Sequence, residues 1–154
     1  MSFEDLPTDW PHRSVADPIL AADLVDLVLS DADRREGALG LLLCRTGGRL
    51  AQPVVVSTQG CPDVVHLLDT VLEELPYLPG ITGLVLAIAR PWGGVTDADR
   101  TLHQVALEVC RSHDLTLWGT FLATSTGVSQ LPVARELAPH LGGPDTAGGP
   151  DTAA

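Results

Sequence analysis

The residues best suited to binding or catalysis lie at positions 84–99, where an apolar run is followed by a glycine-containing loop and a helix start. Arg90 and Trp92 stand close together in this loop, and such a pair is typical of protein-binding hot spots. The other interpretation is an arginine that reaches solvent beyond a strand end, beside a tryptophan that covers the core. Thr96 and Asp99 have the spacing of a capping box, so capping alone explains both residues.

This segment contains no complete metal-binding or phosphate-binding motif. Asp99 and His103 are four residues apart, so they share one helix face and together offer two metal ligands. A zinc site needs three or four ligands, and the spacing fixes no third one. Gly93-Gly94 matches neither glycine-rich phosphate motif, and acidic residues in the first helical turn, including Asp97, repel anions. We therefore expect no catalytic residue, no bound metal and no cofactor.

Composition restricts the class of protein. The chain has 154 residues, 45% of them apolar, which suits one globular domain. Its formal net charge is -11 and its nine basic residues, all arginine, are scattered, so we expect no nucleic-acid binding. No apolar run approaches the roughly 20 residues of a membrane span, and no signal peptide is evident. The sequence therefore predicts a cytoplasmic protein without membrane association, and its arginine, alanine, glycine and proline bias is typical of a G+C-rich bacterial genome.

Hydrophobic periodicity predicts an α/β domain in which helices flank a mixed β-sheet. In order, we expect a helix at 18–35, a hairpin of strands at 38–44 and 49–56, a helix at 62–75, a strand at 83–89, a helix at 96–113, strands at 115–123 and 128–131, and a short helix at 132–140. Pro53 indicates that the second strand is an edge or carries a bulge. Residues 1–16 should be irregular, residues 17–141 should form the single domain, and residues 142–154, with two GGPDTA copies, should be a disordered tail.

Three segments together resemble a known family. The hairpin reads ALGLLLCRTGGRLAQPVVVS, the strand and loop read LVLAIARPWGGVTDAD, and the last strands read LTLWGTFLATSTGVSQL. In element order and spacing, residues 38–131 resemble the JAB/MPN domain, specifically its RadC-type branch. The resemblance implies a JAB/MPN-like sheet architecture with layers like those of cytidine deaminases.

The departures from the family pattern concern its chemistry. The family binds zinc through the two histidines of an H-x-H motif and the aspartate of an S-x-x-D motif, and a hairpin glutamate handles the water. Here Ile88 and Arg90 stand at the histidine positions, Thr96 stands at the serine, and Asp99 alone remains as a ligand. Residues 38–62 contain no Asp or Glu. The resemblance thus implies a domain that has lost its Lewis acid and its general base.

The resemblance implies a catalytically inactive domain that serves as a protein-binding, scaffold or regulatory module. We expect its binding surface at the vestigial site, with Arg90 and Trp92 at the centre and Thr96 and Asp99 on the rim. The partner would be another protein or a second copy in a homodimer. Two alternatives stay open: a sensor whose Arg90 pairs with a small anionic ligand, and a metal-dependent hydrolase with a rearranged site built on Asp99 and His103.

Overall fold

The computed structural model describes residues 3–132. The expected helix at 132–140, beyond its first residue, and the expected tail at 142–154 lie outside the described residues. Within them, five strands form one mixed sheet in the order β2-β1-β3-β4-β5. The strands are β1 (Ala38–Arg45), β2 (Arg49–Ser57), β3 (Gly83–Ala89), β4 (Thr116–Thr124) and β5 (Gly127–Gln130). Only β3 and β4 pair in parallel; the other neighbours are antiparallel.

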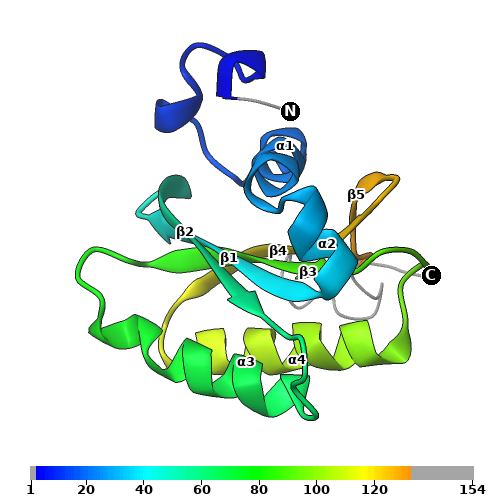
Figure 1. Ribbon diagram of the computed structural model, residues 1–154. Coiled ribbons are helices and arrows are strands. Elements are labelled where there is room, and N and C mark those ends of the chain that lie inside the picture. Colours follow the sequence, from blue (N-terminus) through cyan, green and yellow to red (C-terminus); the bar gives the residue numbers. More distant parts are fainter. Residues whose placement is uncertain (1–2, 133–154) are drawn as a thin grey trace, which may run out of the picture.

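Helices cover both faces of the sheet (Figure 1). Those on one face are α1 (Pro18–Val28) and α2 (Asp31–Glu36), and those on the other are α3 (Val64–Glu73) and α4 (Asp97–Ser112). Each face has its own hydrophobic core: the first packs against α1, and the second lies under α3 and α4. All seven residues of β3 are buried, because this central strand is covered on both faces. The expected α/β fold with a mixed sheet and flanking helices is confirmed.

The expected helix at 18–35 was wrong in one respect, because the chain breaks into α1 and α2. Leu29 ends α1 with extended backbone, and Ser30 starts α2 through a capping box. The Ser30 hydroxyl accepts from the amide of Asp33 at 3.1 Å, and the Asp33 carboxylate accepts from the amide of Ser30 at 2.9 Å. The local capping interaction therefore interrupts the continuous helix that was expected over this range.

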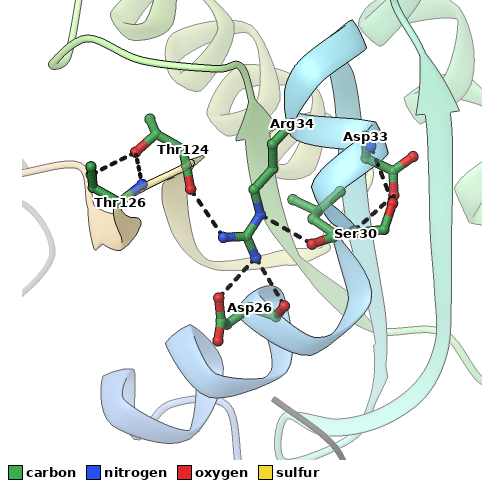
Figure 2. A network of polar contacts seen from close by, with 7 residues as sticks. Asp26, Ser30, Asp33, Arg34, Thr124 and Thr126 are labelled. Atoms are coloured by element: carbon green, nitrogen blue, oxygen red, sulfur yellow. Dashed lines mark hydrogen bonds and ion pairs between the residues drawn. The ribbon is translucent and has the colours of Figure 1, made fainter.

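Arg34 closes this break from inside the protein (Figure 2). Its side chain is buried, and the guanidinium donates from Nε to the carbonyl of Leu29 at 3.1 Å and from Nη1 to the carbonyl of Thr124 at 3.0 Å. Nη2 donates to both the carbonyl (2.9 Å) and the carboxylate (2.8 Å) of Asp26. A single side chain thus joins α1, α2 and the end of β4.

The edge of the hairpin has its expected character. β2 is an edge strand, as Pro53 indicated, and the β1–β2 register shifts between Leu43 and Cys44. Before α1, the chain forms the short 3₁₀ turns η1 (Phe3–Asp5) and η2 (Trp10–His12). None of the helices among residues 3–132 has the length and apolar character required to cross a bilayer.

Candidate functional site

The loop between β3 and α4 carries the candidate site, and a capping box fixes where its helix begins. The Thr96 hydroxyl accepts from the amide of Asp99 at 3.2 Å, and the Asp99 carboxylate accepts from the amide of Thr96 at 2.8 Å. Capping therefore explains Thr96 and part of the role of Asp99, as the sequence indicated. The helix positions Asp99 directly across the loop from the end of β3.

Arg90 follows β3 and folds back onto Asp99. The contact is a two-pronged ion pair, with Nη1 at 2.7 Å from Oδ1 and Nη2 at 2.6 Å from Oδ2. Nη2 also donates to the carbonyl of Gly94. The Asp99 side chain is only 2% exposed and that of Arg90 is 24% exposed. Bidentate pairs of this kind are strong and directional, so Arg90 holds both ends of the loop together.

The electrostatics of the pair keep both groups charged. Burial alone would raise the pKa of Asp99, but hydrogen bonds from Arg90 and from the Thr96 amide outweigh it and hold the pKa below its usual value. The hydrogen bond to Asp99 raises the pKa of Arg90, although burial opposes part of this effect. Each charge is therefore neutralised by the other inside the site.

The four residues expected to form one binding surface differ in their exposure. Asp99 was expected on the rim of an exposed site, but it is buried beneath the loop and bound to Arg90. Arg90 was expected at the centre of the surface, and its guanidinium is instead half-buried and used internally. Thr96 is exposed, as a rim residue should be. Trp92 is 78% exposed, which removes the interpretation that it covers the core.

A pocket of about 370 Å³ lies beside the ion pair. Its wall contains the buried side chains of Leu39, Ile88 and Leu102 together with Val64 and Ala98. We call it the apolar pocket.

Charged groups border the apolar pocket. Arg35 and Glu36 from the end of α2 line it, as do Arg90 and Asp99. Pro91, the residue before Trp92, lines it as well. The pocket and the exposed tryptophan are therefore neighbours at one end of the sheet.

His103 and Asp99 each have another partner, so they do not form a shared site. His103 Nδ1 lies 2.7 Å from the hydroxyl of Thr120 on β4, while Asp99 is held by Arg90. Across the part of the chain that the structure describes, no group of three or more His, Cys, Asp or Glu side chains is arranged to hold a metal ion. The geometry gives no support to the rearranged hydrolase.

The anion-sensor alternative also finds little support in the geometry. Both Nη atoms of Arg90 already donate, to Asp99 and to the carbonyl of Gly94. An anion that approached Arg90 would meet the Asp99 carboxylate within the same pair. Binding would require breaking a two-pronged ion pair and leaving a buried carboxylate without its cation.

His103 supplies a pH-dependent contribution to stability. Burial lowers its pKa, so the folded state favours the neutral imidazole. This contribution is fully present above about pH 6.5, the usual unfolded value, and is lost as pH falls through the lower folded pKa. Wild-type protein should therefore lose stability below about pH 6.5, and His103→Gln should remove that part of the slope in urea unfolding.

The matched control for His103 is His66→Gln, which changes an exposed histidine at the start of α3. Because its side chain is exposed, this change should alter the free energy of unfolding at neutral pH by no more than about 0.5 kcal/mol. An unchanged slope in His103→Gln would show that burial of this imidazole does not govern stability in the window.

Sequence reasoning missed the Arg90–Asp99 pair, although it named both residues. They are nine positions apart and belong to different elements, so neither helical nor strand spacing relates them. The available signal was an arginine that directly follows an entirely apolar strand. Such a charge needs a partner, and Asp99 at the next helix start was the nearest one that a capping box would bury.

In comparisons with known proteins, no family model matches the chain, and no curated protein or solved structure matches it.

Proposed function

We propose that this chain is a catalytically inactive JAB/MPN-like module that binds protein through a surface formed by Trp92 and the apolar pocket. The observation that most strongly supports an inactive site is the ion pair, in which the carboxylate of Asp99 is held by Arg90 and by the amide of Thr96. Arg90 supplies the positive charge beside the one carboxylate that the family pattern retains. The resemblance is supported by the hairpin, helix, strand, helix and strand pair that run in the same order along the chain.

Two features suit this surface to protein binding: the exposure of Trp92 and the contacts that fix the loop around it. A tryptophan that is 78% exposed presents a large apolar area, and this residue type is enriched among interface hot spots. Arg90 ties the end of β3 to Gly94 and Asp99, so the loop that carries Trp92 is held at both ends. A loop that is fixed before binding loses less conformational entropy when a partner docks.

The test is a capture experiment with the full chain immobilised and a lysate of the source cells as prey. Immobilised wild type should retain a defined set of proteins from the lysate. Copies of this same protein that are captured from the lysate count as partners. Trp92→Ala should reduce their recovery more than tenfold, because losing a hot spot costs about 2 kcal/mol or more.

Tyr77→Ala is the matched control for the capture experiment. Tyr77 is an aromatic side chain with 81% exposure, located in the segment before β3 rather than after it. This variant should capture the same proteins as wild type. Equal recovery by wild type and Trp92→Ala would refute the assignment of the binding surface.

A further inference from the structure

We propose that the partner of this surface is a second copy of the chain, in a twofold dimer in which Trp92 of each copy enters the apolar pocket of the other. The inference rests on the proposed binding function of this surface and goes further by naming the occupant. A twofold interface uses the same patch on both subunits, so the patch must complement itself. Pro91 lines the apolar pocket and the next residue, Trp92, is 78% exposed, so a projecting side chain and a recess are neighbours along the chain.

The pocket has the chemistry that an indole requires. Its wall is apolar, and Leu39, Ile88 and Leu102 are already buried there. A buried indole N–H needs an acceptor, and the exposed carboxylate of Glu36 lies on the pocket border. Trp92 does not line the pocket of its own chain, so the pocket is open to the tryptophan of another copy.

Charge favours this patch as the meeting point of two copies. The formal net charge of -11 makes most approaches between identical chains repulsive. The pocket border carries Arg35 and Arg90 against Glu36 and Asp99, so two positive and two negative charges cancel. Two copies therefore meet here without bringing a net negative charge on each side into contact.

The expected dimer is of moderate affinity. Two inserted tryptophans bury on the order of 150–250 Å² of side chain each. That is a small part of the roughly 1,200–2,000 Å² in a standard stable interface. We therefore expect association and dissociation to be visible at micromolar concentrations.

The experiment is sedimentation equilibrium of the full chain at several micromolar concentrations. Wild type and Tyr77→Ala should approach twice the 16.2 kDa chain mass as concentration rises. Two variants should stay monomeric: Trp92→Ala, which removes the inserted group, and Ala98→Phe, which fills the pocket from an exposed position on α4. Circular dichroism of all variants checks that the fold is retained.

Mixing the two monomeric variants tests the reciprocal insertion itself. The Trp92→Ala chain keeps an open pocket and the Ala98→Phe chain keeps its tryptophan, so a mixed pair has one of the two insertions. The equimolar mixture should therefore form dimers that neither variant forms alone, although more weakly than wild type. A mixture that stays monomeric overturns reciprocal insertion, as does a Trp92→Ala variant that dimerises like wild type.

A wild type that is monomeric at every concentration also overturns the inference, and the capture experiment then separates the two proposals. If capture of other proteins still depends on Trp92, the surface binds a different protein and only the second copy is wrong. If neither the capture of proteins nor the sedimentation mass depends on Trp92, both the proposed function and the dimer are wrong.

Discussion

Replacing Arg34 by methionine is expected to lower the free energy of unfolding by about 2–5 kcal/mol, because its buried guanidinium donates to two main-chain carbonyls inside the protein. Its ion pair with Asp26, whose side chain is 38% exposed, contributes little to this loss. Methionine retains an apolar stem but donates no hydrogen bond. The carbonyls of Leu29 and Thr124 lose the donors that they have inside the protein, and each unsatisfied buried group costs about 1–3 kcal/mol. Urea unfolding followed by circular dichroism measures the change.

The neighbouring residue provides the control for Arg34. Arg35→Met changes an exposed arginine on the same helix and should alter stability by no more than about 0.5 kcal/mol. Arg34→Lys should fall between the two, because a single ammonium cannot span the carbonyls of Leu29 and Thr124 and also pair with Asp26. If Arg34→Met proves as stable as Arg35→Met, the buried network does not hold α1 and α2 to the sheet.

The second large effect is expected from Arg90→Met, which leaves the Asp99 carboxylate 2% exposed with only the hydrogen bonds of the capping box. We expect a loss of about 3 kcal/mol. Asp99→Asn should cost less, about 1–2 kcal/mol, because the Arg90 side chain is already 24% exposed and can turn toward solvent. The double variant should be more stable than the sum of the single losses implies, with a coupling of about 1–3 kcal/mol.

The pH dependence of the Arg90 variant gives an independent check. The pKa of Asp99 is lowered in the folded wild type, so its contribution is present above the unfolded value of about 3.9 and is lost as pH falls through the folded pKa. Without Arg90, that pKa rises and the variant gains relative stability when Asp99 is protonated. The stability gap between wild type and Arg90→Met should therefore shrink in acid; a constant gap would contradict the ion-pair account.

Local sequence signals predicted much of the fold. The strand expected at 83–89 is β3 residue for residue, because an apolar run that is too short for a helix is typical of a covered central strand. The capping pair Thr96 and Asp99 likewise marked the start of α4. Both signals are local, and the spacing of residues along the chain predicts structure only within a single helix, strand or cap.

The parts that the sequence did not predict depend on contacts between distant elements. Arg34 and Thr124 are ninety positions apart, and only the tertiary fold brings them within hydrogen-bonding distance. Arg90 and Asp99 meet across a loop whose path no periodicity describes. The exposure of Trp92 also depends on that path. Tertiary contacts therefore decided which polar residues became structural and which side chain stayed available for binding.

Metal content, measured by elemental mass spectrometry, tests directly the proposal that Arg90 takes the place of a bound cation beside Asp99. The full chain is purified untagged without chelator, and its unfolding temperature is measured with and without added zinc. We expect far less than one equivalent of transition metal per chain and no stabilisation by zinc. One tightly held metal per chain, which raises the unfolding temperature and is lost in Asp99→Asn, would contradict this proposal.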